Sequence, residues 1–524
     1  MSTVLPLRRL ALALLVLAAP PWLASAASAG GDLRVAACKR DITPVSPNLV
    51  AAYEEAFGEG ATVNHTDPVL MAGFGNGREA TGYNDRIWAR GVVVEAQGKR
   101  IAIVSLDLIG YFTNEIDTIR GLISPKARID YLVVSSTHQH EGPDTMGLWG
   151  PDELTTGIDF GYLDFVNASV ADCVEQATRG LQKARVRFTT TDSAGLSLGL
   201  DAEDDGLGVA DGKVLDGDEA LAPATGGRFV NSRLSVMQFT RRNKRRVLAT
   251  LVNFASHPES LGSDNTLLTS DFPHYARERL EAEYAGVAIW VSADLGVLQG
   301  PLDIDVLDPA TQEPAPRRTF RFAEVHGTQL AERVISAVDP KGRGEKKPDL
   351  EYATTKPLPI PVANPFFRAL AALGAINPRR DFYTDGEPDN GFDFPFPPPF
   401  QSLPQSTGED LHTEVGALRI GEGSFAVVPS ELDPQIGEGY RAAMAGANHT
   451  FIVGLGNDSI GYQVPFAKWD DSCHTCAPYV FAGEEDLCPV QPVDCNTVFQ
   501  NNVGQEVDPK VSGAVLPLIE SLHD

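Results

Sequence analysis

Four segments of the chain place polar side chains directly after a run of apolar residues. The segments are DYLVVSSTHQHEGPD, VLATLVNFASHPES, SFAVVPSELDP and TFIVGLGNDSIGYQVP. Their candidate residues are His138, His140, His257, Glu431, Asn457, Asp458 and Tyr462. Imidazole and carboxylate groups are ligands that suit zinc, and a catalytic zinc site typically keeps one position open for water. The chemistry that these residues could perform is therefore metal binding and the activation of a water molecule.

The spacing of the first two histidines supports this interpretation. His138 and His140 are two residues apart, so in an extended chain both imidazoles project to the same side. A single histidine after a strand is more often a packed or surface residue. However, the chain has only 10 histidines, and three of them fall in such loops. On the pattern alone, a metal site and ordinary structural histidines both remain open.

The elements that position these residues are short runs rich in Val, Ile and Ala, separated by helix-like patterns. The predicted strands are Ala89 to Glu95, Arg100 to Leu106, Tyr131 to Ser136, Val247 to Ala255, Val287 to Ser292, Val415 to Ile420, Ser424 to Val428 and Phe451 to Leu455. The predicted helices are Tyr162 to Ala184, Pro273 to Tyr284, Phe320 to Val338 and Pro434 to Ala445. This alternation predicts an α/β fold with mixed or mostly parallel sheets and flanking helices. Because each polar group follows its own strand, we expect the metal site at the carboxyl ends of the strands.

The start of the chain is typical of a cleaved signal peptide. Residues 1–29 combine Arg8 and Arg9, an apolar run from Leu10 to Ala19, and small residues near Ala26. The run is shorter than the ~20 apolar residues that span a bilayer, so we expect no transmembrane segment and a secreted or periplasmic protein. A lipoprotein signal ending at Cys38 is the alternative.

Length and charge limit the organisation and the partners. Of the 524 residues, those after the signal peptide exceed the ~250–300 at which a single core usually stops growing. Two lobes, or one α/β domain with long insertions, are expected. The net charge of −27 argues against a nucleic-acid partner, because such a surface repels phosphates. The oligomeric state cannot be deduced.

Six cysteines in an exported chain indicate disulfides before metal ligands. Cys473, Cys476, Cys488 and Cys495 predict two local disulfides of undetermined pairing, with a zinc knuckle as the alternative. The other two, Cys38 and Cys173, are either buried thiols or a third bridge.

Two stretches interrupt the α/β pattern. Residues 200–227 are acidic and glycine-rich, which favours a solvated surface insertion over a calcium site, since the spacing fits no EF-hand loop. Residues 358–408 are rich in proline and aromatic residues, and we expect a packed loop there, a candidate lid beside an apolar substrate. Its aromatic residues that could line an acyl channel, or simply pack the loop, are Phe392, Phe394, Phe396 and Phe400.

Taken together, the motifs resemble those of the neutral ceramidase family. The similar segments are STHQHEGP, NFASHPES, VPSEL, the NDxxGY element, KRDITP and MAGFGNGREATGYNDRIWARGVVVEAQGKRIAIVSLDL. The resemblance extends, with gaps, from about Ala36 to Gln463. It implies a catalytic domain over residues 30–465. Neutral ceramidases commonly add an immunoglobulin-like domain, whereas here we expect a cysteine-rich tail over 466–524 and no such domain.

The resemblance also implies a function. By similarity, Zn2+ would be held by His138, His257, Glu431 and Tyr462, and His140 would be a close neighbour that orients the site or contacts the substrate. By its position His140 is also the best available catalytic acid or base, since imidazole titrates in the useful range. A zinc-activated water would hydrolyse the N-acyl bond of a small-molecule or lipid substrate.

One departure concerns the substrate. Where the family has a serine at the active centre, this chain has SADLGVLQGPLD, with Gln299 and Gly300 in the matching region. A zinc esterase, a peptidase-like amidase on the same scaffold, and a non-catalytic binding protein derived from it are the alternatives.

Overall fold

The computed structural model describes residues 31–199, 230–243, 246–297, 299–302, 304–339, 341–390, 408–481, 485–493, 495 and 497–523. The expected signal peptide (1–29) and the acidic insertion (200–227) lie outside the described residues, as do Phe392, Phe394, Phe396 and Phe400.

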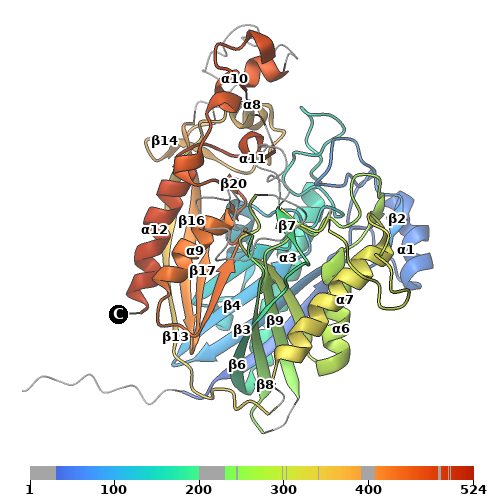
Figure 1. The fold of residues 1–524 in the computed structure, drawn as a ribbon, viewed down its shortest axis with the longest axis vertical. Coiled ribbons are helices and arrows are strands. Elements are labelled where there is room, and N and C mark those ends of the chain that lie inside the picture. Colours follow the sequence, from blue (N-terminus) through green and yellow to red (C-terminus); the bar gives the residue numbers. More distant parts are fainter. Residues whose placement is uncertain are drawn as a thin grey trace, which may run out of the picture.

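Two β-sheets stack face to face, with helices on both outer sides (Figure 1). The strands of the larger sheet, in spatial order, are β11 (Val287–Ser292), β9 (Val247–Phe254), β8 (Arg233–Arg241), β6 (Gln182–Asp192), β1 (Arg34–Asp41), β3 (Trp88–Ala96), β4 (Lys99–Leu106) and β5 (Tyr131–Ser136). Those of the smaller sheet are β15 (Glu387–Pro388), β14 (Phe382–Thr384), β16 (Asp410–Ile420), β17 (Gly423–Val427) and β19 (His449–Val453), and β13 (Leu350–Pro361) also pairs with β16.

The larger sheet consists of two four-stranded halves that meet at a narrow joint. Only Arg34 and Val35 of β1 pair with β6. The half formed by β11, β9, β8 and β6 bends back toward the other half, so that the end of β11 lies beside the end of β5. There the Ser292 hydroxyl donates a hydrogen bond to the Thr137 carbonyl at 2.7 Å. This bend brings loops from distant parts of the sheet together at one place.

Both faces of the central strands are buried. In β4, Ile101 and Ile103 point into the core between the two sheets, whereas Ala102 and Val104 point toward the helices on the other face. Successive side chains of a strand point to opposite faces, so a strand buried on both sides reads as a continuous apolar run. This is why these strands were predictable from the sequence.

Helices cover the two outer faces. Against the larger sheet lie α2 (Thr113–Leu122), α3 (Phe160–Arg179), α6 (Phe272–Tyr284) and α7 (Phe320–Ala337), and against the smaller lie α8 (Pro365–Leu373), α9 (Pro434–Ala443) and α12 (Val507–Ser521). The remaining helices are α1 (Val50–Phe57), α10 (Ser472–Phe481) and α11 (Thr497–Gln500). None of the helices in the described ranges has the length and apolarity that crossing a bilayer requires.

The expected mixed α/β class is confirmed, and three details are corrected. The larger sheet is mixed, with parallel pairing only between β9 and β11 and between β4 and β5, so the mostly parallel alternative is wrong. The helix predicted to reach Ala184 ends at Arg179, with Gly180 as its C-cap, because β6 begins at Gln182. The described part of residues 358–408 is not a plain loop, since it contains the end of β13, then α8, β14 and β15.

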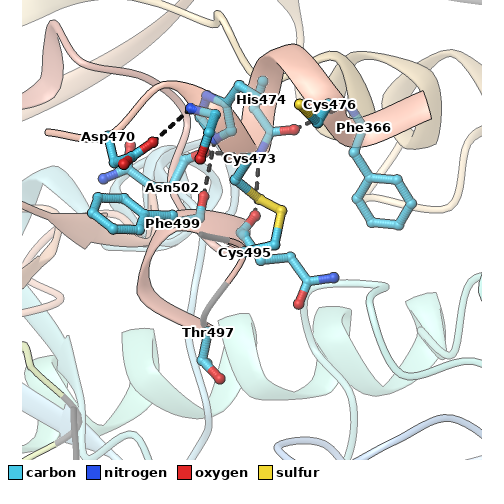
Figure 2. Close-up of a disulfide and its surroundings, with 12 residues drawn as sticks. Phe366, Asp470, Cys473, His474, Cys476, Cys495, Thr497, Phe499 and Asn502 are labelled. Carbon is cyan, nitrogen blue, oxygen red and sulfur yellow. Dashed lines mark hydrogen bonds between the residues drawn. A yellow bond between two sulfur atoms is a disulfide. The ribbon is translucent and has the colours of Figure 1, made fainter. Parts of the chain in front are cut away.

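Three disulfides are present among the described residues. Cys473–Cys495 and Cys476–Cys488 are the two local bridges that the sequence predicted, and Cys38–Cys173 is the third, joining β1 to α3. The zinc-knuckle alternative is wrong, because all four cysteines of the tail are bonded to one another. Figure 2 shows Cys473–Cys495 linking α10 to the segment before α11.

Candidate metal centre and active site

The polar groups singled out in the sequence come from the ends of four strands. His138 and His140 follow β5, and His257 follows β9. After β17 the chain forms the short strand β18 (Glu431–Leu432), and after β19 it forms β20 (Tyr462–Gln463). These two short strands pair in parallel with Glu431 beside Tyr462, so the fold brings these two side chains together through backbone register.

Their side chains converge on one point. The Glu431 Oε2 atom lies 3.1 Å from Nε2 of His257 and 3.3 Å from Nε2 of His138. The Tyr462 hydroxyl lies 3.3 Å from Nε2 of His257. A ring nitrogen from each of His138, His140 and His257 lies within 4.8 Å of the other two, and all three residues are buried. The structure therefore brings together all five predicted site residues.

The backbone fixes how two of these imidazoles face the cluster. Nδ1 of His138 lies 2.5 Å from the Ile109 carbonyl, and Nδ1 of His257 lies 3.0 Å from the Gln299 carbonyl. A carbonyl only accepts, so each Nδ1 carries a proton, and in a neutral ring Nε2 then presents a lone pair. Both lone pairs face the Glu431 carboxylate. Two imidazole lone pairs and a carboxylate are stable side by side only with a proton or a cation among them. Histidine nitrogens and a carboxylate oxygen are ligands that suit zinc.

The electrostatics of the cluster are dominated by burial and by Glu431. Burial alone raises the pKa of Glu431, but His138 and His257 outweigh it and hold that pKa well below its ordinary value. For His138, burial opposes the charged ring, yet Glu431 prevails and the pKa is raised. The pKa of His257 is lowered, because there burial prevails. The carboxylate is thus ionised and available to a cation.

His140 is packed tightly but has no hydrogen bond at its ring. Neither ring nitrogen has a hydrogen-bond partner among the described residues, and the nearest carboxylate oxygen, Oε2 of Glu259, lies 3.6 Å from Nδ1. A Cβ atom on Gly73 would lie only 2.4 Å from Cβ and Cγ of His140. Burial, then the rings of His138 and His257, lower the pKa of His140 well below its ordinary value, so the ring is neutral.

The sequence predicted that His138 and His140 point to the same side because the chain is extended there, but the structure shows a different reason. β5 ends at Ser136, and His138 has a φ of 64°, which is left-handed rather than extended. This conformation costs roughly 1–2 kcal/mol for a residue with a side chain. The two rings lie edge to face with centroids 5.2 Å apart because the loop folds, not because strand alternation continues.

The cluster lies at a cavity of about 430 Å³, which is in the ~300–1,000 Å³ range of ligand pockets. Its polar lining near the cluster comprises His138, His140, Glu259, Glu431 and Tyr462. Its apolar wall includes Phe74, Ile109, Phe112, Met146, Leu148, Trp149, Leu302, Val362, Phe367, Ile376, Phe382, Leu411, Leu455, Ile460 and Val503.

The cysteine-rich tail forms part of this wall. Thr497, Gln500, Asn501 and Val503 line the cavity, and the Asn501 carbonyl accepts a hydrogen bond from the Tyr462 amide at 3.0 Å. The Cys473–Cys495 bridge lies beside Phe499, whose carbonyl accepts a hydrogen bond from His474 at 2.9 Å (Figure 2). The tail therefore completes the site rather than standing apart from it.

Asn457 and Asp458, two of the candidate residues, make structural hydrogen bonds. So does Gln299, which lies in the region where the family has a serine. Asn457 accepts a hydrogen bond from the Val134 amide at 2.8 Å, and both carboxylate oxygens of Asp458 accept from Arg380 at 2.8 Å. The side-chain amide of Gln299 donates hydrogen bonds to the backbone carbonyls of Ala255 and Asn231 at 2.6 and 2.7 Å, away from the cluster. The backbone carbonyl of Gln299 orients the His257 ring.

Two contributors to the site were missed. One is Glu259, although its place two residues after His257 in the HPES segment could have drawn notice. The other is the wall formed by the tail, for which the sequence carries no signal.

Two solved structures resemble this fold. A structure described as neutral ceramidase from Pseudomonas aeruginosa matches with a TM-score of 0.65 and 16% sequence identity, over 94% of this chain and 74% of that chain. A structure described as a ceramidase complexed with C2 matches with a TM-score of 0.63 and 16% identity, over 94% and 75%. No protein-family description and no curated protein matches the sequence. The chain therefore has a ceramidase-like fold, and at this identity the similarity concerns the fold alone.

Proposed function

We propose that the protein is a zinc-dependent amidohydrolase that cleaves the N-acyl bond of a lipid-like substrate, as in the neutral ceramidases that it resembles. One observation carries the proposal: three buried histidines and a carboxylate converge at one end of a cavity whose wall is mainly apolar. A ceramidase-like fold agrees with it. Such a cavity suits a substrate with a long acyl chain and a reactive polar group.

In this proposal, zinc is held by His138, His257, Glu431 and Tyr462. Two imidazole Nε2 atoms and a carboxylate oxygen already face one another, and the Tyr462 hydroxyl lies next to them. Bound zinc would supply a Lewis acid and lower the pKa of a water molecule to about 7.

The remaining residues would orient the reactants. His140 is neutral and has no hydrogen-bond partner within the described ranges, so its ring is free to accept a proton from the attacking water and return it to the leaving amine. The apolar wall would hold the acyl chain and exclude water from the reacting carbonyl.

The setting also agrees with an exported enzyme. Three disulfides indicate an oxidising compartment, so we propose secretion or a periplasmic location. A small molecule or a lipid is the proposed substrate, because the site is a cavity rather than an extended surface.

Hydrolysis of a fluorescent N-acylsphingosine, with and without a chelator, tests this function. We expect turnover that chelation abolishes and zinc restores, and that His257→Ala removes in both conditions. The matched control is His449→Ala, because His449 lies at the start of β19 and does not line the cavity. If the corresponding ester were cleaved while the amide was ignored, the esterase alternative would replace the proposal. Zinc binding without turnover of any N-acyl compound or ester would point to a binding protein.

A further inference from the structure

Glu259 places a second carboxylate at the reactive end of the cavity. Its side chain is only 5% exposed, it lines the cavity, and its Oε2 lies 3.6 Å from Nδ1 of His140. The loop that carries it is fixed against the cluster, because the Pro258 carbonyl accepts a hydrogen bond from the His140 amide at 3.1 Å. This carboxylate is separate from Glu431, which faces His138 and His257.

The space that Glu259 occupies exists because residue 300 is a glycine. A Cβ atom on Gly300 would lie 2.4 Å from Oε1 of Glu259 and 3.5 Å from Cβ of His257. Real Cβ atoms do not approach an oxygen that closely, so any side chain at position 300 would displace the carboxylate. The preceding residue, Gln299, turns its side chain away and leaves this part of the wall to Glu259.

We infer that Glu259 is a specificity-determining residue that recognises a hydrogen-bond donor, a hydroxyl or an ammonium group, on the amine portion of the substrate. This inference rests on the proposed function, which places the scissile bond beside the cluster. The oxygens of a carboxylate accept hydrogen bonds. A donor next to the scissile bond could donate a hydrogen bond to Glu259, whereas an apolar amine portion would bring no such hydrogen bond to this buried carboxylate.

Other polar residues line the cavity, among them Ser459, Thr497, Gln500 and Asn501, but Glu259 and Glu431 are the only carboxylates among the described residues that line it. Arg380 also lines the cavity, but both of its terminal nitrogens are hydrogen-bonded to Asp458. The Tyr462 hydroxyl and the Glu431 carboxylate face the histidine cluster. Glu259 thus lies at the reactive end of the cavity, on the side of His140.

The test compares three substrates with one fluorescent acyl chain: an N-acyl amino alcohol, an N-acyl diamine with a free ammonium group, and an N-acyl alkylamine with no donor. For the zinc-loaded enzyme we expect kcat/KM to be about tenfold or more higher for the first two. Glu259→Leu, which removes both acceptor oxygens, should remove this preference and leave the alkylamine substrate within about twofold. Gly300→Ala should act in the same direction by displacing the carboxylate, and Glu54→Gln, on the exposed face of α1, is the matched control.

The neutral amino alcohol and the charged diamine show whether a hydrogen-bond donor is sufficient, and neither advantage should change much with salt, because a pair with a buried carboxylate is screened little. An equal loss for all three substrates in Glu259→Leu, or no change, would overturn the inference. Should the wild-type enzyme cleave none of them, calorimetric binding of the free amines to the zinc-loaded protein replaces turnover. A binding preference for the amino alcohol and diamine that Glu259→Leu abolishes would then support Glu259 while the proposed function fails, and equal binding of all three amines would overturn it.

Discussion

Nε2 of His257 lies 3.1 Å from Oε2 of Glu431, although the two residues are 174 positions apart in the chain. The first follows a strand of the larger sheet and the second follows a strand of the smaller sheet, so only the stacked pair of sheets creates this contact. Two imidazoles of the cluster, those of His138 and His257, are each oriented from behind by a backbone carbonyl, which places the lone pair of Nε2 toward the carboxylate. The arrangement fits a cation better than it fits an empty centre.

Zinc should therefore stabilise the folded protein. At a free zinc concentration 100 times the dissociation constant, binding contributes about 2.7 kcal/mol, which for a chain of this size raises Tm by about 3 °C. Glu431→Gln removes the charge and should abolish the shift. Differential scanning calorimetry with stepwise zinc addition measures it. An equal shift in the variant would show that zinc binds elsewhere.

Gly73→Ala should displace His140 and lower activity. The added Cβ would lie 2.4 Å from Cβ and Cγ of His140, so the ring must move, and overpacking of this kind costs about 1–3 kcal/mol. We expect kcat to fall more than tenfold, because small displacements of a catalytic group are that costly. Steady-state kinetics and Tm provide the readout.

The control for this variant is Gly98→Ala. Gly98 also has a positive φ, of 83°, but a Cβ there would meet no atom within 4 Å. The Gly98→Ala variant should therefore have the same kind of backbone strain but keep its kcat. Similar kinetics in the two variants would contradict the role given to the packing of His140.

Removal of the Cys473–Cys495 bridge should affect both stability and substrate binding. The bridge closes a loop of 22 residues, and its loss is expected to cost about 3 kcal/mol. Because the segment that follows Cys495 lines the cavity, KM for a long-chain substrate should rise in the double Cys→Ser variant. Kinetics with substrates of increasing acyl length measure this effect.

The Cys38–Cys173 bridge provides the comparison, since it joins β1 to α3 and neither cysteine lines the cavity. Its double Cys→Ser variant should lose stability and keep KM. If KM rose equally in both variants, the tail would not be a wall of the site.

His326 should make the protein less stable in mild acid. It is fully buried in α7, and Nε2 donates to the Leu196 carbonyl at 2.7 Å. Burial lowers its pKa to about 4 from 6.5. Below pH 6.5 the unfolded chain therefore binds a proton that the folded protein does not, and stability falls as the pH drops toward 4.

Between pH 7.5 and pH 5 this difference amounts to roughly 2 kcal/mol. His326→Gln keeps a donor for Leu196 and cannot titrate, so it should lose about that much less stability over the interval. Urea unfolding of both proteins at the two pH values gives the comparison. Parallel pH dependence would contradict the assignment to His326.

The sequence was informative where local pattern decides structure. Val287–Ser292 and Tyr131–Ser136 were predicted with the bounds that the structure has, since strands buried on both faces are continuous apolar runs. β6 (Gln182–Asp192) was missed, although its first half alternates charged and apolar residues as a strand does, because the predicted helix was continued past Gly180 to Ala184.

The site was predictable as a set of residues, but not as a geometry. Polar groups after strands pointed to His138, His257 and Glu431, yet the left-handed φ of His138 and the bend between the sheet halves are tertiary effects with no local signal. Glu259 was missed for a related reason. Its importance depends on Gly300 and His140, which only the fold brings close to it.

The central claim is that one zinc ion is held by side chains from four strand ends, and crystallographic anomalous scattering at the zinc edge tests it most directly. The account predicts a single strong peak about 2.0–2.3 Å from Nε2 of His138, Nε2 of His257, a Glu431 carboxylate oxygen and the Tyr462 hydroxyl. A crystal grown with zinc that shows no peak among these atoms, or a peak bound only by other residues, would contradict it.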